Sequence, residues 1–256
     1  MPTYRDEAVV LRTHKLGEAD RIITVLSRRN GKIRAVARGV RRTSSKFGGR
    51  LEPFSHVDLQ FANGRTLDVV TQAVTLHSFA EPLGADYPAY TTGQVILETA
   101  DRLVAEEREP ALQQFLLLVG ALNALTSGTA DGGRPATMIM DSYLLRAVAL
   151  AGYAPSLTDC ARCGRAGPHD AFAPQLGGMV CPSCRPPGAG YVREGVAAYL
   201  ASLVTGDWVA TRAVSPVVQR AGSGLVSAFA SWHLDRGLRS LNHVDRPSPP
   251  VDMLGA

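Results

Sequence analysis

The four cysteines of this 256-residue chain form two Cys-x-x-Cys pairs, Cys160 with Cys163 and Cys181 with Cys184. Two thiolates three positions apart on a tight turn face the same ion, and a second pair completes the tetrahedron that Zn²⁺ prefers. Because sulfur fills all four positions, no site is left open for a catalytic water. The spacing therefore predicts one structural Zn²⁺ per chain.

Other uses of the cysteines are two disulfides or a thiol redox pair. Stable disulfides are rare in a cytosolic chain, and a redox Cys-x-x-Cys normally occurs singly beside a βαβ pattern, which this sequence lacks. His169 lies between the pairs and is a further candidate ligand, although four cysteines suffice. Gly164 and the Gly177-Gly178 pair are expected to supply the turns of the site.

The second feature with chemical potential is a basic stretch without any acid, from Arg28 to Arg50. A run of like charges repels itself and is normally offset by a partner of opposite charge, for which a phosphate backbone is the leading candidate. Phe47 lies within it and is expected to offer a stacking face for a base. The predicted nucleic-acid-binding residues are Arg28, Arg29, Lys32, Arg34, Arg38, Arg41, Arg42, Lys46 and Arg50.

The charge of the chain is unevenly distributed. Residues 1–80 hold 14 Lys and Arg against seven Asp and Glu, a surplus of seven, so that the rest of this +4 chain carries −3. Such asymmetry indicates a polyanionic partner for the basic part. An anionic membrane surface is the competing partner, but the stretch has no amphipathic helix to insert.

Residues 4–78 have the pattern of β-structure. Lys32–Arg38 alternates, with Ile33, Ala35 and Ala37 on one face. Asn30-Gly31 and Asn63-Gly64 are dipeptides typical of tight hairpin turns in which both central residues have φ > 0. Five short strands with Gly-rich turns predict an OB-fold barrel.

From residue 87 the apolar period becomes helical. The expected helices are Tyr90–Glu106, Pro110–Leu125, Ala136–Leu150, Arg193–Leu203 and Val217–Leu241, with Trp208 and Trp232 expected in the helical core. The predicted fold is thus α+β: an N-terminal five-stranded OB-fold barrel at 1–80, then an all-α domain at 81–245. A zinc insertion occupies about 155–191, and 246–256 is expected to be a disordered, Pro-rich tail.

The sequence offers no catalytic arrangement. It contains no Gly-x-x-x-x-Gly-Lys-Ser/Thr loop and no His-Glu-x-x-His pair, and its six histidines are dispersed. Its apolar runs are far shorter than the roughly 20 residues that span a bilayer, and no signal peptide is visible. We therefore expect a non-enzymatic protein of the cytoplasm, associated with the nucleoid.

Several local patterns together resemble one family. They are Leu16–Asp20, Gly31-Lys32, Ala37–Arg42 with Ser45, Leu51–Phe54, Asp141–Pro155 followed by the cysteine pairs and Gly177-Gly178, and His233-Leu234 with Leu238–Leu241. In order and coverage they are similar to RecO, a family of bacterial recombination mediators. Some of its members lack the cysteines, so the resemblance does not require zinc.

The resemblance implies DNA repair and recombination. It implies binding of single- and double-stranded DNA, annealing of complementary strands, and help in loading the recombinase RecA onto DNA coated by single-strand-binding protein. It also implies RecR and the acidic tail of single-strand-binding protein as partners, with Arg236 and Arg239 as candidate contacts for that tail. The residues alone also allow an RNA-binding or ribosome-associated barrel with a zinc ribbon, or a thiol oxidoreductase.

Overall fold

The computed structural model describes residues 2–234 and 237–245. The chain divides into two compact units, residues 1–126 and 127–256. The first unit contains the barrel together with three helices, so this division lies further along the chain than the predicted boundary at residue 80. Within the described residues, no helix combines the length and the apolar character needed to cross a membrane.

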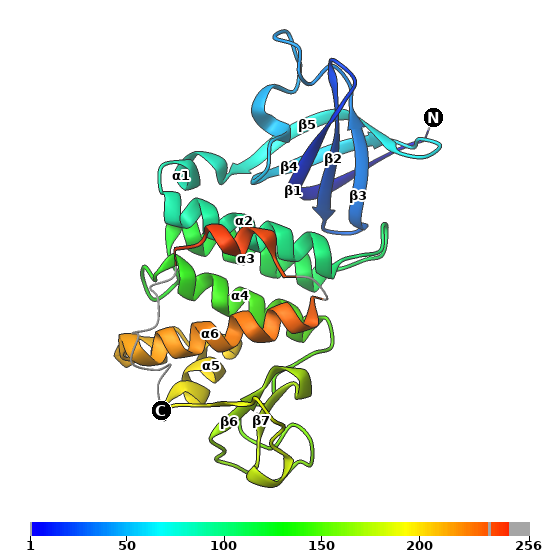
Figure 1. The fold of residues 1–256 in the computed structure, drawn as a ribbon. Coiled ribbons are helices and arrows are strands. Elements are labelled where there is room, and N and C mark those ends of the chain that lie inside the picture. The colour runs from blue at the N-terminus through cyan, green and yellow to red at the C-terminus, as the bar shows by residue number, and fades with distance from the viewer. Residues whose placement is uncertain (1, 235–236, 246–256) are drawn as a thin grey trace. The chain divides into compact units, whose positions relative to one another are not determined.

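Five strands form a closed barrel in the order β1-β2-β3-β5-β4 (Figure 1). They are β1 (Thr3–Leu16), β2 (Asp20–Ser27), β3 (Gly31–Ala37), β4 (Ser55–Ala62) and β5 (Asp68–Ser78). The contact of β3 with β5 is parallel and the other pairings are antiparallel. This is the five-stranded barrel expected of an OB-fold.

The barrel core follows from the alternation of the strands. Ile33, Ala35 and Ala37 share one face of β3, as the alternation predicted, and this face is buried in one cluster with Ile23 and Phe61. Successive side chains of a strand point to opposite faces, so Lys32 and Arg34 take the other face of β3.

Both predicted hairpin turns are wrong in type. Ser27 pairs with Gly31, so the β2–β3 turn has three residues and Gly31 takes the left-handed conformation after it, at φ +63°. An alanine Cβ at Gly31 would lie 1.7 Å from the carbonyl oxygen of Glu109, so this close approach also requires glycine. Between β4 and β5 the connection spans residues 63–67, and Gly64 does not have positive φ.

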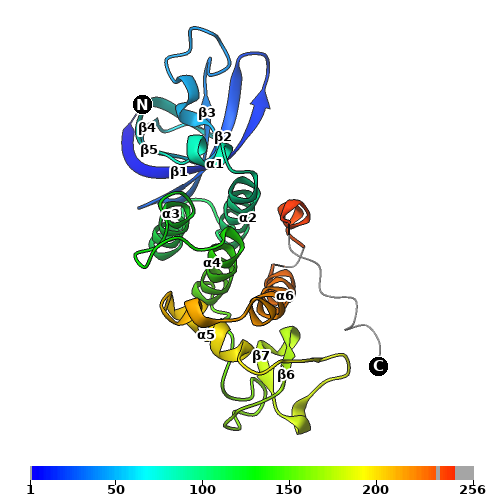
Figure 2. The ribbon, with the colours of Figure 1, turned by 90° about the vertical axis from the view of Figure 1, so that its left-hand side faces the viewer.

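Three helices complete the first unit: α1 (Ala80–Gly84), α2 (Tyr87–Leu103) and α3 (Leu112–Ser127). Figure 2 shows α2 and α3 side by side next to the barrel. The helix α2 begins three residues before the predicted start, because the Asp86 side chain accepts a hydrogen bond from the Ala89 amide and Pro88 suits the first turn.

The second unit contains α4 (Ala136–Leu150), α5 (Val196–Thr205) and α6 (Pro216–His233), which pack against one another. The bounds of α4 are those predicted. The predicted last helix is too long: α6 ends at His233, four residues before Gly237, and Arg239–His243 is a separate 3-10 helix. The predicted tail at 246–256 lies outside the described residues.

A small sheet lies between α4 and α5 in sequence. Its strands β6 (Ala171–Ala173), β7 (Gly178–Val180) and β8 (Gly190–Tyr191) have the order β7-β6-β8. The sheet lies on the side of α5 and α6 that faces away from α4 (Figures 1 and 2). We call residues 155–191, which include this sheet and all four cysteines, the four-cysteine module.

The prediction that both tryptophans belong to the core is wrong. Trp232 lies on α6 and is 59% exposed, and Trp208 is half-buried in a turn after α5. Helical spacing of an aromatic residue does not show which face of the helix the fold covers.

Candidate nucleic-acid interface and metal centre

The β3–β4 loop, residues 38–54, is fixed to the barrel by its apolar side chains and its backbone. Val40, Phe47 and Leu51 are buried in the barrel core. The Gly39 amide donates to Asp20 Oδ1 at 2.7 Å, and the Arg41 amide donates to the Ala19 carbonyl at 2.9 Å. The loop therefore covers one end of the barrel beside the β1–β2 turn.

Phe47 is not available for stacking. Its side chain is only 2% exposed and belongs to the barrel core, while Lys46 Nζ lies 5.0 Å from its ring centroid. The expectation that Phe47 offers a face to a base is wrong, because the ring is buried among the side chains of the barrel core.

Three of the nine predicted basic residues already have acidic partners within the protein. Arg28 Nη1 lies 3.0 Å from Glu7, Arg34 Nη1 lies 3.3 Å from Glu107, and Lys32 Nζ lies 3.4 Å from Asp101 Oδ1. Lys32 is also 92% buried and donates to the Asp101 carbonyl at 2.9 Å. These acids lie far from the basic stretch in sequence, so the stretch contains no acid but does not lack acidic neighbours.

The other six are exposed and have no acid within ion-pair distance in the part of the chain that the structure describes. Arg29 belongs to the β2–β3 turn. The remaining five share the β3–β4 loop, and we call them the cationic cluster: Arg38, Arg41, Arg42, Lys46 and Arg50.

The hydrogen bonds within the cationic cluster leave its charge uncompensated. Arg41 Nη1 donates to the Gly17 carbonyl at 3.3 Å, Lys46 Nζ to the Thr71 carbonyl at 2.8 Å, and Arg50 Nη1 to the Lys46 carbonyl at 2.8 Å. Carbonyls orient the cations but carry no formal charge. Glu52, an acid of the same loop, is paired with Arg21. The result is an ordered loop with five positive charges.

Sequence reasoning missed two cations near OB-fold binding loops. Lys15 lies at the end of β1 opposite Arg21, beside the turn that the β3–β4 loop contacts, and Arg65 lies in the β4–β5 connection. Both are exposed and have no acidic partner among the described residues. OB-folds use the β1–β2 and β4–β5 loops for oligonucleotides. Once the strand order identifies these two loops, Lys15 and Arg65 can be recognised as candidate contacts.

The structure brings the four cysteine sulfurs together as predicted. All four Sγ atoms lie within 4.8 Å of one another, and the Sγ atoms of Cys163 and Cys181 are 3.8 Å apart. A tetrahedron with metal–sulfur bonds of about 2.3 Å has an edge of about 3.8 Å. The donor set therefore fits a four-coordinate thiolate site. His169 is not part of it, and its Nε2 lies 2.9 Å from the Arg165 carbonyl.

Backbone geometry holds the sulfurs in place. The Gly164 amide donates to the Cys160 carbonyl at 2.8 Å, and the Cys184 amide donates to the Cys181 carbonyl at 3.0 Å, which closes each Cys-x-x-Cys turn. Gly164 has φ +72° and Gly177 has φ +83°, as expected for glycines that make the turns of the site. At Gly178, an alanine Cβ would lie 2.2 Å from the Ser156 carbonyl.

The pKa values of two of the four thiols are shifted in opposite directions. Hydrogen bonding from the Cys181 backbone lowers the pKa of Cys160 to about 6, whereas a side-chain hydrogen bond with Cys163 raises the pKa of Cys184 to about 12. Four thiolates this close repel one another without a cation between them. The cluster is therefore a possible metal site, and the lowered pKa of Cys160 favours its thiolate form, which binds metal.

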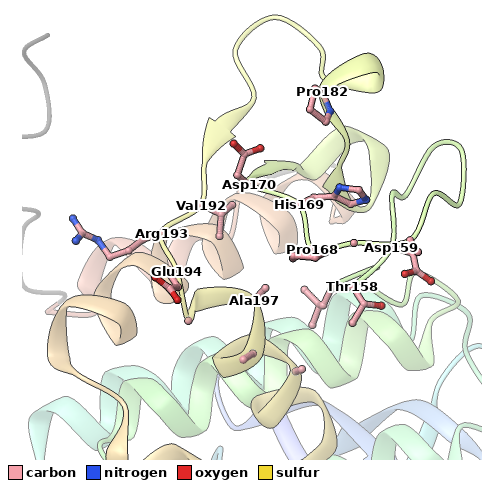
Figure 3. Close-up of a pocket in the computed structure, with 16 residues that line it drawn as sticks. Thr158, Asp159, Pro168, His169, Asp170, Pro182, Val192, Arg193, Glu194 and Ala197 are labelled. Carbon is pink, nitrogen blue, oxygen red and sulfur yellow. The ribbon is translucent and has the colours of Figure 1, made fainter.

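A cavity of about 1070 Å³ lies between the four-cysteine module and α5 (Figure 3). Its lining is mostly small or apolar and includes Leu157, Val192, Ala197 and Ala201. In Figure 3 the Arg193 side chain points away from this cavity. None of the cysteines and none of the predicted nucleic-acid-binding residues lines it.

Fold and site together define an OB-fold barrel protein whose second, helical part carries a four-cysteine cluster. Two family models match the chain: "Recombination protein O N terminal" over residues 1–79 and "Recombination protein O C terminal" over residues 84–242. These two stretches cover nearly the whole sequence.

Curated relatives agree with the family models. The chain is 59% identical to "DNA repair protein RecO" of Cutibacterium acnes (strain DSM 16379 / KPA171202), over 96% of this chain and 100% of the relative. It is 56% identical to the protein of the same name from Nocardioides sp. (strain ATCC BAA-499 / JS614), over 95% and 99%, and 51% identical to that of Thermobifida fusca (strain YX), over 96% and 100%. The chain belongs to the RecO family, whose members are non-enzymatic recombination mediators.

Proposed function

We propose that this protein binds single- and double-stranded DNA through the cationic cluster and anneals complementary strands. The main support is that five exposed cations on one barrel loop have no acidic partner among the described residues. Phosphates supply the missing negative charge, and their binding releases counterions. Because the contacts are to phosphate, they position a strand without reading its sequence.

Annealing follows from the same charges. Two complementary strands repel each other until a cation-rich surface screens them, so the cationic cluster lowers the barrier to their encounter. We further propose that the protein works with RecR and assists the loading of RecA onto DNA coated by single-strand-binding protein, in the cytoplasm at the nucleoid. The names of the relatives and the family models support this role in DNA repair.

We propose Zn²⁺ as the ion of the four-cysteine cluster. All four ligands are sulfur, and the sulfur spacing fits a tetrahedron. When bound, zinc would offset two of the four thiolate charges and crosslink the two Cys-x-x-Cys turns, a structural contribution. The module has little core of its own, a cluster of small side chains around Cys160, Cys181 and Val180.

The acidic tail of single-strand-binding protein is the proposed peptide ligand of the helical unit. An acidic, apolar tail needs an apolar groove with cations at its rim. Of the two candidate contacts, Arg239 lies in the 3-10 helix Arg239–His243, and Arg236 lies outside the described residues. Calorimetry with a tail peptide tests this proposal, and no detectable heat of binding at high peptide concentration contradicts it.

The DNA proposal is tested by measuring binding to a single-stranded DNA and to a structured RNA of equal length, and annealing of two complementary DNA strands. We expect preferential binding of the DNA and acceleration of annealing. Tighter binding of the structured RNA, with no acceleration of annealing, favours the RNA-binding barrel instead.

A further inference from the structure

Tyr191, in the four-cysteine module, exposes its aromatic ring to an unusual degree. It is 76% exposed, although it lies at the end of strand β8 and its backbone is well held. Tyr191 pairs with Ala171 of β6, and the amide of the next residue, Val192, donates to the Asp170 carbonyl at 2.7 Å. The ring is therefore presented to solvent from a fixed backbone.

One face of this ring is already covered by a cation. Arg185 Cζ lies 3.6 Å from the ring centroid, a close cation–π contact. The guanidinium is itself held, because Arg185 Nη2 donates to the Ala189 carbonyl at 3.2 Å, and Arg185 directly follows Cys184. The cysteine cluster and the small sheet thus fix an Arg–Tyr stack whose second face is open.

We propose that the open face of Tyr191 stacks on a nucleobase of single-stranded DNA, as a second contact besides the cationic cluster. The inference rests on the proposed function, because it assumes that the protein binds single strands. Stacking on an aromatic ring suits any base, since every base has a π-face, and a guanidinium behind the ring extends the stack.

The surrounding charges indicate stacking and not phosphate binding. Arg185 lies on the ring, and Arg193 follows two residues after Tyr191. Asp170 is next to Ala171, the β6 partner of Tyr191, and Glu194 follows three residues after Tyr191. Positive and negative charges therefore nearly cancel around the ring. A contact of this kind changes affinity without changing the dependence of affinity on salt, which separates it from the phosphate contacts of the cationic cluster.

The test measures the affinity of the full-length, zinc-loaded protein for a fluorescent single-stranded oligonucleotide and for an abasic sugar-phosphate strand of equal length. We expect Tyr191→Ala to weaken binding to the base-bearing strand roughly 5- to 140-fold. Binding to the abasic strand and the salt slope should not change. Tyr191→Trp, with a larger π-face, should keep or raise the affinity.

Trp232→Ala is the matched control, because it removes another exposed aromatic side chain from the same unit. Zinc content and the unfolding midpoint of each variant report whether the module is intact. If Tyr191→Ala disturbs the module, Tyr191→Leu, which keeps bulk but has no π-face, should show the same base-dependent loss.

Wild-type affinity in Tyr191→Leu, or an equal loss on the abasic strand, overturns the inference while leaving the proposed function intact. Failure of the wild-type protein to bind any single strand overturns the proposed function as well.

Discussion

Replacing Arg38, Arg41 and Arg42 with Ala removes three guanidinium groups of the cationic cluster. All three are exposed, and none has an acidic partner among the described residues. The fold should survive, because surface substitutions of this kind usually change stability by only about 0.5 kcal/mol. The bond that Arg41 donates to the Gly17 carbonyl is also exposed, so its loss costs little.

The expected loss of affinity follows from counterion release. If each guanidinium contacts one phosphate of a single strand, the slope of log affinity against log salt should flatten by roughly 0.7 per contact, or about 2 in total. At about 0.1 M salt this corresponds to a loss of roughly 100-fold, similar for strands of any sequence. Strand annealing should fall together with binding.

The assay is fluorescence anisotropy of a labelled single strand over a series of salt concentrations, with annealing measured in parallel. The matched control replaces Arg5, Arg28 and Arg34, which lie on the same barrel but pair with Asp58, Glu7 and Glu107. It removes the same total charge, and we expect a smaller loss of affinity and little change in slope.

Two results refute the reasoning. If the Arg38, Arg41 and Arg42 variant keeps wild-type affinity and slope, the β3–β4 loop is a solvated surface and DNA binds elsewhere. If both triple variants lose affinity equally, net charge and not the placement of the cationic cluster decides binding.

Three further predictions concern the metal and stability. Cys160→Ser should remove the bound zinc and make the four-cysteine module sensitive to protease, whereas elemental analysis that finds no metal in the fresh wild-type protein contradicts the zinc site. Gly31→Ala should destabilise the protein by more than about 2 kcal/mol in chemical unfolding, because its Cβ meets the Glu109 carbonyl; Gly17→Ala, also at positive φ but with open space, should cost about 1 kcal/mol. Burial lowers the pKa of His233 below its usual value, so the neutral form is favoured in the fold. Stability should therefore fall as pH drops from about 6.5 through the lowered pKa, and His233→Gln should reduce that dependence in thermal unfolding at pH 5 to 7; an unchanged pH dependence in His233→Gln contradicts this role of His233.

The spacing of residues along the chain was enough to predict the periodic features. Alternation placed Ile33, Ala35 and Ala37 on one face of β3, the face that the structure buries, and the 3.6-residue period gave the bounds of α4. The two Cys-x-x-Cys pairs predicted a cluster that the structure contains. These features depend on local backbone geometry, and that geometry requires residues of one type at fixed spacings along the chain.

Features that depend on the pairing register were less predictable. The dipeptides at residues 30–31 and 63–64 favour tight turns, but the strands end where their pairing ends, which gave longer connections at both places. Likewise, the Asp86 side chain caps α2, which therefore begins at Tyr87, three residues before the predicted start at Tyr90. Turn composition limits the allowed backbone, while the partner strand selects among the possibilities.

The charge and composition of the first 80 residues, by themselves, determined that this protein has a strongly basic barrel. Only the tertiary structure decided which cations are free, because Glu7, Asp101 and Glu107 reach Arg28, Lys32 and Arg34 from distant parts of the sequence. It also decided that Phe47 fills the barrel and that Tyr191 stays exposed. Ion pairing and burial depend on distances in space. The separation of two residues in the sequence determines their distance in space only when both lie in the same turn or strand.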